Sequence, residues 1–555
     1  MSTFTPHRAL FLCLALCQCT GSITGEQSGN GEPGDPNNPN NPSNPTTPTV
    51  VAGFQAAPGA LRKLTVAQYR NSIHDVLGTE IIVPDDLEAD TSVNGYTAIA
   101  AAQGTVSATA AEKFEDAAYD IAAQAMTEPV RSRLVACTPA ATTDDTCARQ
   151  ALSSIGNRAF RRPLTEVELG RFIGVANAAA VALGDFYSGM QFGVAAILQS
   201  VPFLYRVEVG EPDPKDATAY RYTASEMGSR LSYLIWNTTP DDELLGKVTD
   251  GTLVNTDVLK AQAQRLLASP RAKDGISTFH YERFSLAHLH HVAKDATTYP
   301  QMTESLLEAM GQEIQEVAAD IVMNKRDYRE LLTGRSTFVN GELASLYGLT
   351  ASGTTFSKAT FPDTSPRSGV LTAAAFLAIN AGTIESSPTK RGKFIRETIM
   401  CQSVQLPPPG VVTVIPPQPT KTMREKLAVH AVEPTCAGCH AMLDPIGLSF
   451  EHFDAIGAFR ETDDGVALDV TGNLDGVPFA DARALTELLA TLPITASCSV
   501  RNLYRYALGH VERPTEEAAI TELTTAFTSN GYHFDALIEA LAQSAALRIA
   551  AKPEE

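Results

Sequence analysis

Two cysteines and a histidine near the C-terminal end of the chain have the spacing of a haem attachment site. Cys436, Cys439 and His440 form the pattern C-x-x-C-H. Two thiols at this spacing can add to the two vinyl groups of one haem, and the adjacent imidazole can then ligate the iron from one face. With 9 cysteines and 11 histidines in 555 residues, the pattern is rare by chance. We therefore predict covalent haem c on Cys436 and Cys439, with His440 as an axial ligand of the iron.

A zinc site, a redox-active cysteine pair and a chance match are the alternatives to haem that stay open. A zinc site needs further ligands nearby, and Cys498 is the only cysteine downstream of the motif. A redox-active C-x-x-C begins a helix after a strand of a βαβ unit, and no strand pattern of that kind precedes Cys436. Both arguments favour haem.

The second axial ligand cannot be a methionine from well downstream, as in a standard electron-transfer cytochrome. The last methionine of the chain is Met442, which follows His440 too closely to reach the opposite face of a haem. The remaining candidates are His430, Met423, His452, His510 or no protein ligand at all.

The motif stands in longer strings that carry a family resemblance. TMREKLAVH at 422–430 precedes CAGCH at 436–440, and DPIGLSFEHFD at 444–454 follows it. Other strings are LRKLTVAQYRNSIHDVLG at 61–78, RAFRRPLTEVEL at 158–169, TASEMGSRLSYLIWNTTPDDELL at 223–245 and RNLYRYALGHVERP at 501–514. Together they resemble multidomain, planctomycete-type and myxobacterial cytochrome-like proteins, which are built of domains of unknown function and a C-terminal haem c module. The resemblance implies a haem module but leaves its activity open.

The resemblance also implies roles for three residues around the motif. His430 matches a histidine expected six residues before Cys436, where it would either ligate the iron or hydrogen-bond a haem propionate. Arg424 and Arg460 match positions expected to contact the propionates, and surface salt bridges are their alternative. These three residues complete the set of expected cofactor contacts.

Helical periodicity dominates the chain and long alternating strand patterns are absent, so we expect a mainly α protein. Capping boxes at Thr65, Thr165 and Thr223 mark three helix starts. The expected fold is a multi-module helical body with a cytochrome c-like haem module near the C-terminus. The expected segments are a signal at 1–19, a tether at 20–57, helical modules at 58–148, 149–210 and 211–350, the haem module at 351–466 and a C-terminal helical module at 467–555.

The N-terminus has the pattern of an export signal. Its apolar stretch at 9–16 is too short to span a bilayer. Leu16 precedes Cys19 as in a bacterial lipoprotein site, although Gln18 replaces the usual small residue. Cys17 is the alternative lipidated residue, and a simple cleaved signal is a further one. The Pro/Asn/Gly-rich stretch that follows suits a tether, so we expect a periplasmic or cell-surface protein, an outer-membrane lipoprotein of a Gram-negative bacterium.

Four cysteines remain after the signal and the haem pair are set aside, an even number suited to an oxidising compartment. Four cysteines allow three connectivities. We expect Cys137 to pair with Cys147, closing a short loop worth about 2–3 kcal/mol. Cys401 and Cys498 are then the second pair.

The charge of the chain restricts its partners. With 43 basic and 63 acidic residues the net charge is −20, which argues against binding to nucleic acid or to anionic lipid, so the lipid anchor would be the only membrane contact. The basic residues Arg158, Arg161 and Arg162 are expected to pair with carboxylates.

Three functions fit these features. The first is electron transfer outside the cytoplasm, with an unknown redox partner protein. The second is a haem-dependent oxidoreductase of peroxidase or oxygenase type, acting on an extracytoplasmic substrate. The third is a non-catalytic surface scaffold with structural haem. No catalytic residues outside the haem motif are indicated, because no serine-nucleophile, phosphate-loop or zinc-protease motif occurs in the folded region.

Overall fold

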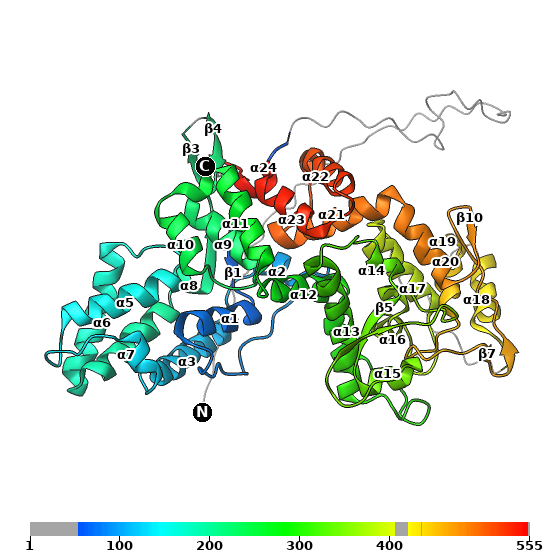
Figure 1. Cartoon of the computed structure of the whole chain (residues 1–555), viewed down its shortest axis with the longest axis horizontal. Coiled ribbons are helices and arrows are strands. Elements are labelled where there is room, and N and C mark those ends of the chain that lie inside the picture. Colours follow the sequence, from blue (N-terminus) through cyan, green and yellow to red (C-terminus); the bar gives the residue numbers. More distant parts are fainter. Residues whose placement is uncertain (1–53, 215, 406–419, 434–435, 553–555) are drawn as a thin grey trace, which may run out of the picture. The chain divides into compact units, whose positions relative to one another are not determined.

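Helices make up most of the described structure, and its strands are short (Figure 1). This computed structural model describes residues 54–214, 216–405, 420–433 and 436–552. The mainly α fold expected from the sequence is confirmed. The expected signal, both candidate lipidation sites Cys17 and Cys19, and nearly all of the tether lie outside the described residues. None of the described helices is long and apolar enough to cross a membrane.

The first part of the chain packs around a hydrophobic core that contains Tyr69, Phe114, Leu152 and Phe203, except that Ile99 belongs to the larger core described next. Its elements are β1 (Ala60–Lys63), α1 (Val66–Leu77), α2 (Thr97–Gln103), α3 (Ala108–Ala125), α4 (Val130–Leu134), α5 (Asp145–Ala159), α6 (Glu166–Leu183), α7 (Phe186–Leu198), α8 (Val201–Leu204) and β2 (Tyr205–Glu208).

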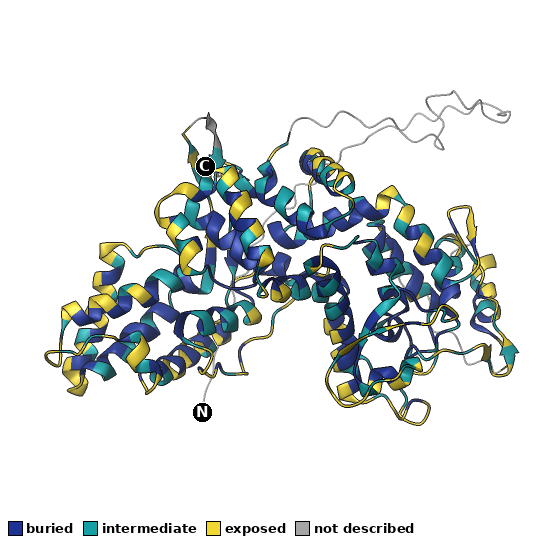
Figure 2. Ribbon diagram, viewed as in Figure 1, coloured by how far each residue is buried: buried dark blue, intermediate teal, exposed yellow. Residues whose placement is uncertain are grey.

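A larger core contains Trp236, Phe376, Phe450 and Leu547, so the middle and C-terminal parts of the chain share one apolar interior. The middle elements are β3 (Glu211–Asp213), β4 (Asp216–Arg221), α9 (Ala224–Ile235), α10 (Asp242–Thr249), η1 (Thr252–Val254), α11 (Thr256–Ala268), α12 (Ala272–Arg283), η2 (Leu286–His291), α13 (Glu304–Met323), α14 (Glu330–Thr333), β5 (Ser336–Val339), α15 (Gly341–Tyr347) and β6 (Ser357–Thr360). Most helices carry buried residues along one side and exposed residues along the other (Figure 2).

The C-terminal elements include α18, which precedes the haem motif, and α19, which contains most of it. In chain order the elements are η3 (Val370–Thr372), α16 (Ala374–Ile379), α17 (Pro388–Phe394), η4 (Ile395–Ile399), α18 (Met423–Val432), α19 (Ala437–Gly447), η5 (Leu448–Phe450), β7 (Thr462–Asp463), β8 (Val466–Ala467), β9 (Gly472–Leu474), β10 (Val477–Phe479), α20 (Ala482–Thr491), α21 (Pro493–Leu508), η6 (Pro514–Glu516), α22 (Glu517–Ser529), α23 (Phe534–Gln543), α24 (Ala545–Arg548) and β11 (Ile549–Ala550).

Local sequence signals set several helix starts. Thr65, Thr165 and Thr223 each accept a hydrogen bond from the backbone N–H of the residue three positions on, whose own side chain accepts from the threonine N–H. The three expected capping boxes are therefore confirmed. Thr422 and Glu425 form a further capping box, which begins the helix preceding the haem motif.

Strand pairing brings distant parts of the chain together. β1 pairs antiparallel with β2, with Leu61 opposite Val207. β11, close to the C-terminus, pairs with β4, with Ile549 opposite Arg221. The remaining pairs are β3–β4, β5–β6, β7–β8 and β9–β10. Strand pairing thus joins the start of the folded chain to β2 and its end to β4.

A buried ionic cluster lies where these segments meet. Glu208 is 1% exposed and forms ion pairs with Arg62, Arg206 and Arg230. Arg62 also donates to the carbonyl of Ala507 at 2.7 Å. Burial opposes ionisation of Glu208, but the three guanidinium groups outweigh it and lower its pKa to about 2. The cluster therefore ties β1 and β2 to α9 and α21.

The expected carboxylate pairing of three arginines is wrong for one of them. Arg158 pairs with Asp242, and Arg162 pairs with Glu168. Arg161 is 2% exposed and donates instead to backbone carbonyls at the end of α8 and the start of β2, including that of Tyr205 at 2.6 Å. An arginine can satisfy such orphan carbonyls because its fork carries several N–H donors.

Candidate haem-binding site

The two cysteines of the motif lie one turn apart at the beginning of α19. Cys436 is the residue before the helix, and Cys439 and His440 are in its first turn. Both cysteines are partly exposed. A side-chain carbon placed on Gly438, between them, would meet no atom within 4 Å. The two thiols are therefore partly accessible at the start of a helix, which suits covalent attachment of a haem.

A carboxylate holds the imidazole of His440. Its Nδ1 lies 2.8 Å from Oδ2 of Asp444, one turn further along α19. Asp444 is 6% exposed, and its other oxygen accepts a hydrogen bond from Oγ1 of Thr389 at 2.7 Å. An ionised carboxylate can only accept, so Nδ1 carries the proton and Nε2 keeps its lone pair for a metal. Ligating histidines in metalloproteins have this arrangement.

His430 is the candidate second ligand that lies beside His440. The centroids of the two imidazole rings are 4.8 Å apart, with 18° between the ring planes. His430 is half-buried, in the last turn of α18. Met423, in the first turn of α18, is 4% exposed and packs with Leu427 and Leu448.

The other two histidines are held elsewhere. The ring of His452 packs edge-on against Phe459, with centroids 5.6 Å apart. Both ring nitrogens of His510 have partners: Nδ1 lies 3.3 Å from the Leu508 carbonyl, and Nε2 lies 2.9 Å from Glu516. The second axial ligand stays a prediction; His430 lies beside His440, but its ring stacks on that of His440 and does not face it across an iron site.

The two arginines expected at the propionates bind protein groups. Arg424 pairs with Asp469 at 3.2 Å and donates to the Asp469 carbonyl. Arg460 contacts Asp463 and the buried carboxylate of Glu451, the latter at 3.2 Å. Both arginines flank the motif in the chain, and a propionate would have to share their guanidinium groups with these carboxylates. Their role at the propionates stays a prediction.

Helix α19 is fixed by close packing against α17. A side-chain carbon on Gly392 would collide with the Leu443 carbonyl, and one on Gly447 would collide with the Pro388 carbonyl. These glycines let the two backbones touch, which places Thr389 next to Asp444. Sequence reasoning missed both contacts, because they depend on which helices are neighbours.

A fully buried arginine holds the segment that follows α19. Arg391, on α17, is 0% exposed and donates to the carbonyls of Phe450 at 2.9 Å, Phe453 at 3.1 Å and Asp454 at 2.8 Å. Burial lowers its pKa to about 10, opposed by the nearby charge of Glu451. These hydrogen bonds tie residues 450–454, which follow α19, to α17.

The described disulfide bonds join Cys137 to Cys147 and Cys401 to Cys498. These are the pairs expected from the sequence. They use the other four cysteines of the folded part, so neither bond consumes a thiol of the haem motif.

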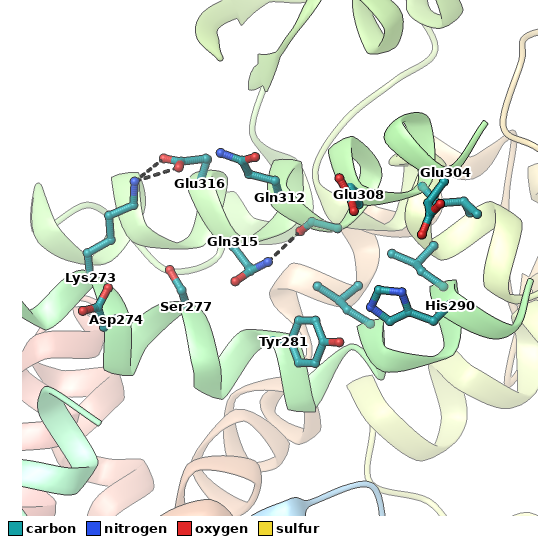
Figure 3. Close-up of a pocket in the computed structure, with 14 residues that line it drawn as sticks. Lys273, Asp274, Ser277, Tyr281, His290, Glu304, Glu308, Gln312, Gln315 and Glu316 are labelled. Carbon is teal, nitrogen blue, oxygen red and sulfur yellow. Dashed lines mark hydrogen bonds and ion pairs between the residues drawn. The ribbon is translucent and has the colours of Figure 1, made fainter. Parts of the chain in front are cut away.

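A cavity of about 660 Å³ lies between α12, η2 and α13 (Figure 3). Side chains of the two helices face each other across it, among them Tyr281, Glu308 and Gln312, and Lys273 pairs with Glu316 at one end. The haem-motif residues are not part of its lining. The cavity therefore assigns no substrate site at a haem iron. Among the described residues, no three His, Cys, Asp or Glu side chains are arranged to hold a metal ion.

Comparisons with known proteins give matches to family models only. No curated protein and no solved structure matches the chain. Five segments match models of protein families of unknown function: DUF1587 at 62–127, DUF1595 at 147–208, DUF1592 at 222–349, DUF1588 at 367–463 and DUF1585 at 475–547. The C-x-x-C-H motif lies within the fourth match, whose model carries the short name PSCyt3. Five segments of the chain are thus similar to families of unknown function that are planctomycete-type and cytochrome-like.

Proposed function

We propose that this chain is an exported, lipid-anchored, monohaem c-type cytochrome-like protein that transfers electrons between partners outside the cytoplasm. The observation that carries the proposal is the pairing of His440 with Asp444 directly after the two motif cysteines. It leaves Nε2 of His440 for the iron and fixes the ring orientation, as expected for an axial ligand. The match of the surrounding segment to a cytochrome-like family model supports the same function.

Each residue of the site has a part in this function. When bound, a haem supplies a one-electron iron couple. Cys436 and Cys439 would hold it covalently at the start of α19, and His440 would ligate the iron. The contact of α19 with α17 and the buried Arg391 keep these groups in a fixed geometry. A rigid site suits electron transfer, because ligands that stay in place need little reorganisation when the iron changes charge.

The position of His430 supports the carrier over the oxidoreductase. Its ring stacks on that of His440, and it would have to turn toward the opposite face of a haem to fill the second axial position. An iron with two histidine ligands has no free site for oxygen or peroxide. Export and lipid anchoring fit the same proposal, because haem c is attached outside the cytoplasm and the expected lipidation site is followed by a tether.

Spectra of the purified protein, matured in the periplasm, test this function. We predict a low-spin haem spectrum, reversible one-electron oxidation and reduction, and no change on addition of carbon monoxide. The matched control is Cys436→Ser/Cys439→Ser, which should lack the spectrum. High-spin iron that binds carbon monoxide and consumes peroxide would favour the haem-dependent oxidoreductase over the electron carrier. A protein without any haem spectrum would contradict both.

A further inference from the structure

We propose that Asp444 is a positioning residue that sets the reduction potential of the haem iron through His440, and that Thr389 holds Asp444 in place. The inference rests on the proposed function, since it concerns a haem ligated by His440. It adds a residue that touches neither the iron nor the cysteines.

The geometry gives Asp444 a single orientation. It lies four positions after His440 on α19, so the two side chains share one face of the helix. One carboxylate oxygen accepts from Nδ1 of His440 at 2.8 Å, and the other accepts from Thr389 at 2.7 Å. Thr389 comes from α17, which the Gly392 and Gly447 contacts press against α19. Thr389, Asp444 and His440 therefore form a chain of hydrogen bonds that links α17 to α19, two helices whose backbones are in contact.

The charge of Asp444 acts on His440 without compensation by a cation. Asp444 is 6% exposed, and within the described residues no lysine or arginine lies within ion-pair distance of it. Arg396, whose guanidinium contacts the nearby Met442 carbonyl, is engaged by Asp475. A buried carboxylate that accepts the Nδ1 proton makes the imidazole a stronger donor to a metal. A stronger donor stabilises Fe(III) relative to Fe(II), which lowers the reduction potential.

This assignment names the kind of partner the protein serves. A lower reduction potential makes the reduced haem a better electron donor than it would be beside a neutral residue. The partner that oxidises the haem then needs a less positive potential. The partner that reduces it must be a stronger reductant. A neutral residue at position 444 would raise the reduction potential of the iron and make the haem a better electron acceptor.

The test is a redox titration of the holoprotein followed by its visible spectrum. Asp444→Asn keeps the shape and removes the charge, and it should lower the Fe(III)/Fe(II) ratio at a fixed ambient potential at least tenfold, which is about 59 mV for one electron. Asp444→Glu, which restores the charge, should lie closer to wild type. Thr389→Val should shift the ratio in the same direction by a smaller factor.

The matched control is Asp464→Asn, which removes one carboxylate charge from an exposed residue near the end of the DUF1588 match. It should leave the ratio unchanged. If Asp444→Asn has the same midpoint as Asp464→Asn while its haem is attached, the inference is wrong and the proposed function stands. If Asp444→Asn is not matured, Thr389→Val decides, and an unchanged midpoint there rejects the inference. A wild-type protein without covalent haem would reject the inference and the proposed function together.

Discussion

The imidazole rings of His430 and His440 lie 4.8 Å apart, although they come from two different helices, α18 and α19. An iron with two histidine ligands holds one on each face of the haem, so the two histidines must approach the iron from opposite directions. The fold brings His430 close to His440, and the His430 ring would have to turn out of its stacked position to ligate the iron from the opposite face. The fold holds His510 in contact with Glu516 instead.

His430→Ala should convert low-spin iron to high-spin iron that binds carbon monoxide or cyanide, because the second axial position becomes open. His452→Ala is the control and should stay low-spin, since the ring of His452 packs against Phe459. Optical and electron paramagnetic resonance spectra of both variants measure the spin state of the iron. A low-spin spectrum that survives in His430→Ala removes this residue from the iron, and a far-red band lost in Met423→Ala would assign the position to that methionine.

Glu208→Gln should destabilise the fold by about 3–5 kcal/mol, because it leaves three buried arginines without their counter-charge. The control is Glu487→Gln, which breaks an exposed pair with Arg483 and should cost about 0.5 kcal/mol. Urea unfolding of both variants measures the difference. Equal midpoints for the two variants would mean that the cluster does not join the segments as described.

Stability should fall as the pH rises from about 4.5 to about 7, partly because of Glu313. Burial raises the pKa of Glu313 from 4.5 to about 7, opposed by hydroxyl donation from Thr337 and Tyr347. Between these pH values Glu313 is ionised in the unfolded chain and protonated in the folded chain. The free energy of unfolding therefore falls by up to about 3 kcal/mol.

Glu313→Gln removes the ionisable group and should flatten the pH dependence of the unfolding midpoint. Glu282, whose pKa burial also raises to about 7, accounts for the slope that remains. Glu308→Gln, on an exposed face of the same helix, should leave the wild-type slope unchanged. A Glu313→Gln variant with the full wild-type slope would contradict the buried, protonated carboxyl.

The disulfide bond between Cys401 and Cys498 should stabilise the fold more than the bond between Cys137 and Cys147. The first spans 97 residues and the second 10, and the loss of chain entropy on cross-linking grows with the loop. We expect about 4–5 kcal/mol for the long loop and about 2–3 kcal/mol for the short one. Paired Cys→Ser variants compared by urea unfolding, after peptide mapping of the wild type, test this order. A larger loss in the Cys137→Ser/Cys147→Ser variant would reverse it.

The protein should carry a lipid near its N-terminus. Metabolic labelling with a palmitate analogue should mark the wild type and fail to mark Cys17→Ala/Cys19→Ala, because these are the cysteines of the expected signal. Single variants identify which of the two is modified, with Cys19 the expected one. Labelling that persists in the double variant would show that the anchor is elsewhere.

Features set by neighbouring residues or by counting could be predicted from the sequence. Thr65 and Gln68 begin a helix through contacts three residues apart, so their pattern is visible without the fold. The disulfide pairs are expected because Cys137 and Cys147 are close in the chain, which leaves Cys401 and Cys498 as the second pair. The mainly helical fold follows from the apolar periodicity.

The role of Asp444 could not be predicted, although a signal for it exists. Its distance of four residues from His440 brings the two together only if 437–447 is a helix, and Pro445 lies inside that helix. A proline there removes a backbone donor and argues against the helix. Contacts to α17 stabilise the helix nevertheless, and they depend on tertiary structure.

Buried arginines could not be predicted for a related reason. Arg391 and Arg161 lie in basic strings that are typical of exposed surface, and each is buried because it satisfies backbone carbonyls of another segment. Such contacts link positions far apart in the chain. The periodicity of one helix contains no information about them.

The most direct test of covalent haem attachment is the intact mass of the mature polypeptide, followed by mapping of the peptide that contains Cys436 and Cys439. We predict a mass increased by one haem, retained after denaturation and acid–acetone extraction and located on that peptide. The Cys436→Ser/Cys439→Ser variant should have the mass of the polypeptide alone. Unmodified thiols at both positions in periplasmically matured protein, or zinc in place of haem, would contradict a c-type cytochrome.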